Sequence, residues 1–497
     1  MMLFLLGFVA VVASKNTDYC YGGADPRKPI EVPSVPDGYE LKTVQVVTRH
    51  GARTALFPLK AHGVPWNCTD STEMSLISLD ANRAAQEQAA RLYRFEYLDH
   101  REILPGNCLT GQLTSLGSKQ HRSIGQGLRK ALVTDTNFLN DTTFREQIYV
   151  RSTEVPRVQQ SAESQLLALF PPQPTATSGD VHVLPIHLVD DDKDDMTPNW
   201  KQCPHLVNYK AEIWSTDSPR QRAALQAIKN ITDVTKLIEK VFNDTEDPTA
   251  SFPDEWLTRY ADTFHTMDCH NMSLPAEITP QIRQRLYAAV DTFWDLLWSY
   301  NKLSVTGLGQ FLTQDFNQQF QARVNNPDAK DPVFYLFSGH DTTVAPLLGA
   351  LRAYDGVWPP LASNIVFQLL RNQQDQSFAV RMVYNGQTIS PEPCNTTLTG
   401  GVAACSWAEW SKLINETAAN YQQYSSLCKQ SNPSPTPPPT NGAGDGDGDG
   451  GTWKVAFLAT AAAALLSWVS FFLMWRRSQK HGGAGHGYDY YVDSVQQ

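Results

Sequence analysis

The sequence predicts an α/β fold in which a helical subdomain is inserted into a sheet domain. Runs rich in β-branched and aromatic residues alternate with helical patterns along most of the chain. From about residue 203 to 325 this alternation gives way to a long stretch of helical texture. Three of the predicted strands end in charged side chains, and in α/β sheets ligands bind outside the carboxyl ends of the strands. We therefore expect a ligand site at one edge of the sheet.

The first predicted strand, 41–47, leads into the motif Arg49-His50-Gly51-Ala52-Arg53. Arginine suits phosphate because its planar fork donates two parallel charge-assisted hydrogen bonds. A neutral imidazole held against such a phosphate can attack phosphorus and form a phosphohistidine. Alone, the motif does not distinguish a phosphate site from a chance basic turn.

Helices and strands are expected to follow in turn. The alanine-rich stretch 79–95 favours a helix, and a second helix is expected from 115 to about 132 with Thr114 as its N-cap. A strand at 147–150 ends at Arg151. Another, 181–189, ends in three aspartates, which we interpret as a solvated acidic turn.

The helical stretch and the strands after it complete the pattern. Apolar residues at helical spacing in 234–241 and 282–300 predict buried helix faces. The apolar strand 333–337 is followed by His340-Asp341, and strands are also expected at 365–370 and 378–384. Parallel strands therefore bring Arg49-His50, Arg151 and His340-Asp341 to one sheet edge.

These three clusters, in this order, resemble the histidine acid phosphatase family. The stretches 111–114, 167–172 and 199–204 add to the resemblance, which covers roughly Tyr39 to Cys428. The layout is similar to the membrane-bound, lysosomal-type members. The resemblance implies a phosphoglycerate-mutase-like mixed sheet flanked by helices, with an inserted helical subdomain. It also implies an acid phosphatase acting on small-molecule phosphomonoesters or phosphoproteins.

The resemblance assigns a role to each charged residue. His50 would be the nucleophile and Asp341 the general acid, whose need for a proton would favour acidic pH. Phosphate oxygens would be bound by Arg49, Arg53, Arg151 and His340. Gly51 and Gly339 would leave room beside the phosphate, and no metal or cofactor is required.

The cysteines indicate disulfides. There are eight, an even number, and all lie between the apolar segments at the two ends of the chain. By resemblance we expect Cys203 to pair with Cys428 and Cys394 with Cys405. Many family members carry a cysteine where this chain has Asn364, and the partner of that cysteine would match Cys269. The pairing of the remaining four is left open: Cys20, Cys68, Cys108 and Cys269.

Both ends of the chain suggest membrane targeting. Residues 1–13 resemble a signal peptide, 14–428 the phosphatase domain, 429–452 a stalk, 453–475 a transmembrane helix and 476–497 a cytoplasmic tail. This layout predicts a single-pass type I protein of the endosomal or lysosomal system or the cell surface, with a lumenal or extracellular catalytic domain and tail-bound sorting adaptors. Seven glycosylation sequons agree with it: Asn67, Asn140, Asn230, Asn243, Asn271, Asn395 and Asn415.

Composition narrows the alternatives. A net charge of −10 argues against a nucleic-acid partner. A phytase-like inositol polyphosphate phosphatase shares the motifs but usually needs a basic pocket rim. A glycosylated surface receptor on the same fold, without turnover, would be expected to have lost one of the six site residues, and all are present. A homodimer is compatible with the sequence.

Overall fold

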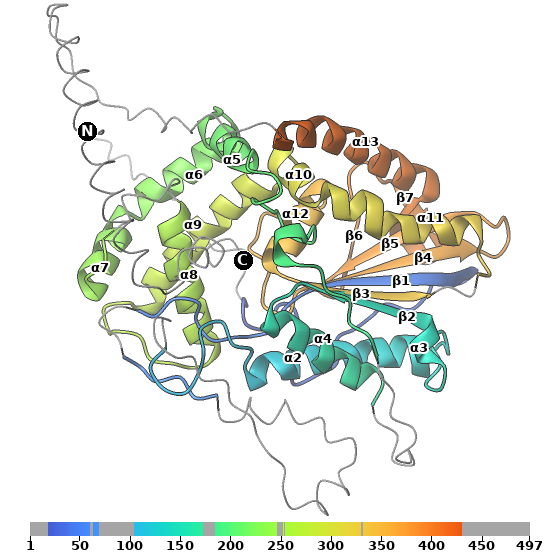
Figure 1. Ribbon diagram of the computed structural model, residues 1–497, viewed down its shortest axis with the longest axis horizontal. Helices are drawn as coiled ribbons and strands as arrows, with labels where there is room; N and C mark the ends of the chain where they lie inside the picture. Colours follow the sequence, from blue (N-terminus) through green and yellow to red (C-terminus); the bar gives the residue numbers. More distant parts are fainter. Residues whose placement is uncertain are drawn as a thin grey trace, which may run out of the picture. The chain divides into compact units, whose positions relative to one another are not determined.

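The computed structural model describes residues 18–59, 63–68, 104–171, 184–245, 252, 254–329 and 332–429. These residues are organised around an eight-stranded mixed sheet of order β2-β3-β1-β4-β5-β8-β7, with β6 paired to β5 (Figure 1). The strands are β1 (Tyr39–Arg49), β2 (Ile148–Ser152), β3 (Phe334–Gly339), β4 (Asn364–Asn372), β5 (Phe378–Tyr384), β6 (Gln387–Ile389), β7 (Thr396–Leu398) and β8 (Val402–Ser406). Strands β2, β3 and β1 are parallel, whereas β4 runs antiparallel to β1.

Helices cover both faces of this sheet (Figure 1). Because side chains alternate along a strand, Val46 of β1 packs toward one face and Val47 toward the other. The Val46 face is covered by α2 (Ser115–Arg129) and α4 (Pro156–Leu169), with the short α3 (Phe144–Gln147) before β2. The Val47 face is covered by α10 (Lys302–Gln310), α11 (Asn317–Asn325), α12 (Asp341–Ala350) and α13 (Trp407–Ser425).

A second group of helices forms a cap beside the sheet (Figure 1). It consists of α5 (Leu206–Ser215), α6 (Pro219–Asn230), α7 (Thr232–Phe242), α8 (Asp254–Cys269) and α9 (Pro280–Trp298), which share one apolar core. Helices α10 and α11 also fall within the predicted subdomain 203–325, but Leu308 and Phe320 pack into the core of the sheet. The helical cap therefore ends with α9.

The other predicted elements have mixed outcomes. The strands expected at 41–47, 147–150, 333–337, 365–370 and 378–384 match β1 to β5. The strand expected at 181–189 is wrong in its described part, where 184–189 forms only an isolated bridge from His187 to Arg151. Thr114 is the N-cap residue of α2, but its hydroxyl bonds Ala52 and His270 instead of the helix. The helix expected at 79–95 lies outside the described residues.

Four disulfides join the eight cysteines. Cys203–Cys428 and Cys394–Cys405 are the pairs that the resemblance implied, and Cys68 pairs with Cys108. The fourth disulfide joins Cys20, ahead of β1, to Cys269 at the end of α8. Asn364, which stands where many family members carry a cysteine, donates its side-chain amide to the Gly23 carbonyl at 2.8 Å. The segment before β1 is therefore fastened to Cys269 by a disulfide and to Asn364 by a hydrogen bond.

The predicted location in an endosomal, lysosomal or cell-surface membrane needs correction. In the part of the chain that the structure describes, no helix is long and apolar enough to cross a bilayer. The longest described helices, α9 and α13, have 19 residues each, and both carry charged side chains along their length. The predicted signal peptide 1–13, transmembrane segment 453–475 and tail 476–497 with its sorting adaptors lie outside the described residues. The predicted homodimer stays a prediction.

Candidate active site

The site lies where β1 and β3 end side by side. Their parallel register aligns Arg49 with Gly339, and the His50 backbone N–H donates to the Gly339 carbonyl at 2.9 Å. His50 and His340 therefore leave the sheet as neighbours. Their ring centroids are 5.6 Å apart, edge to face. The prediction that these two strand ends meet is thus correct in its geometry.

His50 is held in one tautomer. Its Nδ1 lies 2.9 Å from the Gly51 carbonyl, which can only accept, so Nδ1 carries the proton. Its Nε2 is buried and has no hydrogen-bond partner in the described residues. Burial, followed by Arg157, Arg49 and Arg53, holds the pKa of His50 well below its usual range. The arrangement leaves a neutral imidazole with a free lone pair on Nε2.

Tight packing fixes the loop that follows His50. A Cβ on Gly51 would lie 2.4 Å from the Gly117 carbonyl oxygen in α2, so only glycine fits there. The Gly51 N–H donates to the Ser161 hydroxyl at 3.1 Å, which ties the loop to α4 as well. A Cβ on Gly339 would lie 2.3 Å from the Thr343 hydroxyl oxygen. Both glycines thus make room for neighbouring parts of the chain, and the room that they leave beside a phosphate stays a prediction.

Arg49 and Arg53 are both buried, and each faces a carboxylate. Arg49 forms an ion pair with Asp341 at 2.8 Å and donates a short hydrogen bond to the Pro359 carbonyl. Arg53 donates to both oxygens of Asp262 in α8, at 2.7 and 3.2 Å. This bidentate pair links the sheet edge to the helical cap.

Arg151 does not join this group. The register sets its backbone level with Phe337 of β3 and hence with Val47 of β1, three positions and roughly 10 Å before His50 along the strand direction. Its guanidinium instead contacts three carboxylates: Asp194 at 3.0 Å, Asp195 at 2.6 Å and Asp315. The expectation that Arg151 reaches the site is therefore wrong in its geometry.

The arginine that does reach the site is Arg157, which the sequence reasoning missed. It lies in the first turn of α4, just after β2, and its side-chain Nε is buried with no partner in the part of the chain that the structure describes. Burial, followed by the charge of Arg53, lowers the pKa of Arg157 to about 9. Burial lowers the pKa values of His50 and His340 most, and the positive charge of Arg157 is the next largest cause. Its place directly after Pro156, which starts α4 where β2 has just ended, was the available signal.

His340 and Asp341 start α12 at the end of β3. The Nε2 of His340 lies 2.9 Å from the Thr153 hydroxyl, and its Nδ1 is buried without a partner in the described residues. Asp341 Oδ2 accepts from the Trp358 indole N–H at 2.9 Å, in addition to its ion pair with Arg49. Both side chains therefore point at the region bounded by His50 and the arginines.

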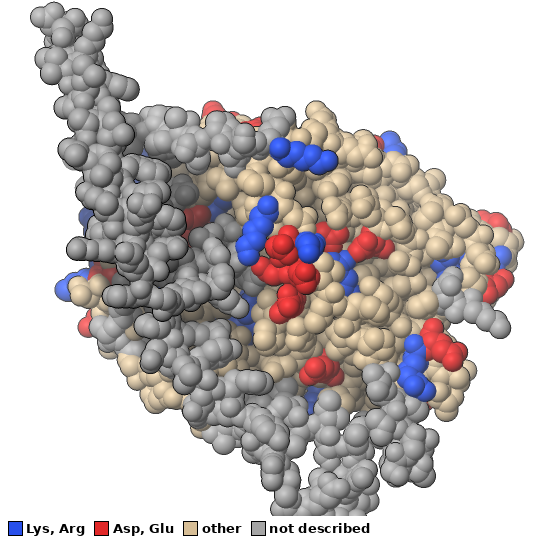
Figure 2. Space-filling model, viewed as in Figure 1, with Lys and Arg blue, Asp and Glu red and all other residues tan. Residues whose placement is uncertain are grey.

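The acidic residues near Arg151 form a separate feature. Figure 2 shows acidic side chains gathered with a few basic ones near the centre of one face of the molecule. Asp190 and Asp192 are exposed, as predicted for a solvated turn, whereas Asp194 is buried against Arg151. Burial raises the pKa of Asp194 to about 6. This network braces β2 and is not part of the histidine site.

Comparison with known proteins identifies the family. The profile of the histidine phosphatase superfamily (branch 2) matches residues 40–385. The chain belongs to this superfamily. Counting factor 60 of Dictyostelium discoideum is 32% identical over 405 residues, which cover 80% of this chain and 91% of that protein.

Relatives of this histidine phosphatase include named acid phosphatases. Lysophosphatidic acid phosphatase type 6 of Homo sapiens is 27% identical over 399 residues, covering 79% of this chain and 87% of that protein. Prostatic acid phosphatase of Bos taurus is 28% identical over 331 residues, covering 65% and 80%. A phytase structure from Citrobacter braakii aligns with a TM-score of 0.48 at 16% identity, covering 76% of this chain and 98% of that one. That likeness is too weak to bear on the phytase alternative.

Proposed function

We propose that this chain is an acid phosphatase that hydrolyses phosphomonoesters through a phosphohistidine on His50. The observation that carries the proposal is the state of His50: neutral, buried, fixed through Nδ1, and with Nε2 free among guanidiniums. A nucleophile for phosphorus needs such a lone pair, held still where a phosphate anion is attracted. The names of the acid phosphatase relatives support the same reaction class.

The phosphate would be bound by Arg49, Arg53 and Arg157, with Arg157 taking the role that we had assigned to Arg151. Among the described residues, these three buried guanidiniums face two carboxylates, Asp262 and Asp341, so the excess positive charge attracts an anion. Preorganised donors of this kind stabilise the charge on the phosphoryl group during transfer. His340 would add one donor, because a Thr153 hydroxyl that donates to Nε2 leaves the Nδ1 proton for a phosphate oxygen.

Asp341 would carry the proton that the reaction needs. In the first step Nε2 of His50 bonds phosphorus, the ester P–O bond breaks, and the protonated carboxyl of Asp341 donates to the departing alkoxide. In the second step the Asp341 carboxylate takes a proton from water, whose oxygen bonds phosphorus while the P–N bond to His50 breaks, which releases inorganic phosphate and restores the neutral imidazole. The Arg49 contact holds Asp341 beside the reacting group, and the Trp358 N–H fixes its orientation. A proton donor that must start protonated favours acidic pH.

The accessory sites also remain proposals. All seven sequon asparagines are exposed: Asn67, Asn140, Asn230, Asn243, Asn271, Asn395 and Asn415. Their exposure supports glycosylation, since the acceptor side chain has to be accessible. We further propose that residues 14–428 form the catalytic domain.

The test compares the full chain with His50→Ala, using p-nitrophenyl phosphate from pH 4 to 8 with chelator present. We expect activity that is highest on the acid side and that falls by about 10³-fold or more in the variant. His205→Ala is the matched control, because His205 lies in the cap and contacts Asn208. Brief reaction with a radiolabelled ester, followed by alkaline quench, should leave label on histidine in the wild type. A His50→Ala protein with wild-type activity would contradict the proposal.

A further inference from the structure

The segment that precedes β1 lies directly against the site. We call residues 18–23 the N-terminal strap. The backbone N–H of Leu361 donates to the carbonyl of Tyr19 at 3.1 Å, and the next residue, Ala362, donates its N–H to the carbonyl of His50 at 3.0 Å. One short turn thus carries the strap on one side and the His50 loop on the other.

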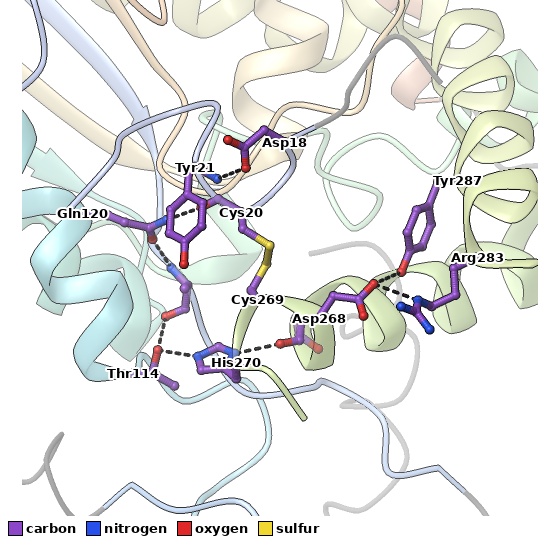
Figure 3. The surroundings of a disulfide bond; sticks show 12 residues. Asp18, Cys20, Tyr21, Thr114, Gln120, Asp268, Cys269, His270, Arg283 and Tyr287 are labelled. Atoms are coloured by element: carbon purple, nitrogen blue, oxygen red, sulfur yellow. Dashed lines mark hydrogen bonds and ion pairs between the residues drawn. A yellow bond between two sulfur atoms is a disulfide. The ribbon is translucent and has the colours of Figure 1, made fainter. Parts of the chain in front are cut away.

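Two further links fasten the strap (Figure 3). The Cys20–Cys269 disulfide ties it to the end of α8. Gln120 of α2 donates its side-chain amide to the Cys20 carbonyl at 2.5 Å, and its side-chain oxygen accepts from the Ala52 N–H at 2.7 Å. Gln120 therefore joins the strap to the same loop that carries His50. The position of the strap relative to the site is fixed from both sides.

This fastening buries the side chain of Tyr19, which is 3% exposed. The ring stacks on His265 of α8, with centroids 3.9 Å apart, and meets Trp358 edge-on at 5.4 Å. The guanidinium of Arg49 lies 5.1 Å from the ring centroid. The aromatic contacts hold the ring, and with it the direction of the hydroxyl.

The hydroxyl of Tyr19 is buried, and its oxygen interacts with the Arg49 guanidinium, but its proton has no acceptor among the described residues. The charges that act on it are those of the site: Arg49, Asp262, Asp341 and Arg53. Burial raises the pKa of Tyr19 far above its ordinary value, so the hydroxyl keeps its proton at any pH at which a phosphatase works. An arginine can only donate, so the nearby Arg49 cannot use that proton. A buried donor without an acceptor is unfavourable unless a ligand supplies the acceptor.

We propose that Tyr19 is a further substrate-binding residue, whose hydroxyl donates a hydrogen bond to a non-bridging oxygen of the substrate phosphate. The inference rests on the proposed phosphatase function and extends the site to a segment outside the family motifs. The Arg49 guanidinium already lies over the Tyr19 ring, so a phosphate bound by Arg49 lies within reach of Tyr19. The Cys20–Cys269 disulfide then acts as a positioning element for phosphate binding, because it anchors the residue after Tyr19.

Tyr19→Phe tests this directly, because it removes one oxygen and leaves the stacked ring. The dissociation constant of inorganic phosphate for the full chain is measured by calorimetry, and KM and kcat are measured with p-nitrophenyl phosphate. We expect the phosphate dissociation constant and KM to rise about tenfold, with a small change in kcat, because the lost bond serves ground state and transition state alike.

Tyr287→Phe is the matched control. Tyr287 stacks on His265, with centroids 3.5 Å apart, but its hydroxyl donates to Asp268 at 2.9 Å, away from the site. This variant loses the same atom from the same aromatic stack. We expect its phosphate affinity to equal that of the wild type. A merely structural role for Tyr19 would instead lower the melting temperature and leave phosphate affinity unchanged.

The double variant Cys20→Ala/Cys269→Ala provides a second measurement. Freed from α8, the strap no longer positions Tyr19, so phosphate affinity falls and adding Tyr19→Phe has little further effect. Equal phosphate affinity in the wild type and Tyr19→Phe, or fully additive losses in the combined variant, would overturn the inference. Phosphate binding requires no turnover. A wild type that binds phosphate but hydrolyses no ester would therefore refute the proposed function, while the Tyr19→Phe comparison would still decide the inference.

Discussion

Arg157→Met, compared with Arg151→Met, tests which arginine serves the phosphate. Both guanidiniums are buried near the end of β2, and both substitutions keep an apolar side chain of similar reach. They differ in their partners. Arg157 has an unpartnered Nε and acts on both site histidines, whereas Arg151 is surrounded by three carboxylates.

The expected magnitudes follow from those partners. Losing a preorganised donor to a phosphoryl transition state costs about 3 kcal/mol, or 10²–10³ in kcat/KM, and we expect this for Arg157→Met. Arg151→Met leaves the buried Asp194 and the half-buried Asp195 without their cation, which costs about 3 kcal/mol of stability. Its kcat/KM at a temperature where it stays folded should lie within about threefold of the wild type.

The pH profile adds an independent readout. Burial does most to keep the pKa of His50 low, and the positive charge of Arg157 is the next largest cause. Without it the pKa of His50 rises toward its ordinary value of 6.5, so the histidine becomes protonated at higher pH. The acid limb of kcat/KM should therefore move to higher pH in Arg157→Met and stay in place in Arg151→Met.

The assay measures kcat/KM with p-nitrophenyl phosphate from pH 4 to 8, together with urea unfolding of each variant. Full activity in Arg157→Met would refute the assignment of Arg157. So would an Arg151→Met protein of wild-type stability that had lost activity. In either case Arg157 would not be the arginine that binds the phosphate in place of Arg151.

Three further predictions concern stability. Burial raises the pKa of Asp194 to about 6 in the folded protein, against an ordinary 3.8, so between these values the folded protein binds a proton that the unfolded chain has released. The free energy of unfolding of the wild type should therefore fall by up to about 3 kcal/mol as pH rises from 4 to 7, and urea unfolding of Asp194→Asn should lack this fall. If the variant and the wild type show parallel pH dependence, Asp194 is not responsible. Gly51→Ala, whose Cβ would lie 2.4 Å from the Gly117 carbonyl oxygen, should lose about 2 kcal/mol or more of stability and most activity. Gly63→Ala, where nothing lies within 4 Å and the backbone is not left-handed, is the matched control and should change neither. Loss of the Cys203–Cys428 disulfide, which spans 225 residues, should cost about 2–5 kcal/mol, and an unchanged melting temperature would contradict this.

Much of the site was predictable because it depends on local patterns. A β-branched strand before Arg49-His50 and an apolar strand before His340-Asp341 are visible in the sequence, and parallel strand ends must meet at one edge. The capping of α2 was predicted for the wrong reason. Thr114 stands at the N-cap position, but its hydroxyl is used by neighbours that are distant in sequence.

The sequence by itself determined strands β1 to β5, the helical texture of the cap and the meeting of Arg49-His50 with His340-Asp341, since periodicity and strand ends are local properties. Only the tertiary structure decided between Arg151 and Arg157. Strand register sets the Arg151 backbone roughly 10 Å before the level of His50, and three carboxylates hold its guanidinium there, whereas Arg157 lies in the first turn of α4 after the strand has ended. The Arg53–Asp262 pair and the Cys20–Cys269 strap were likewise invisible, because both join segments whose meeting depends on how the cap packs against the sheet.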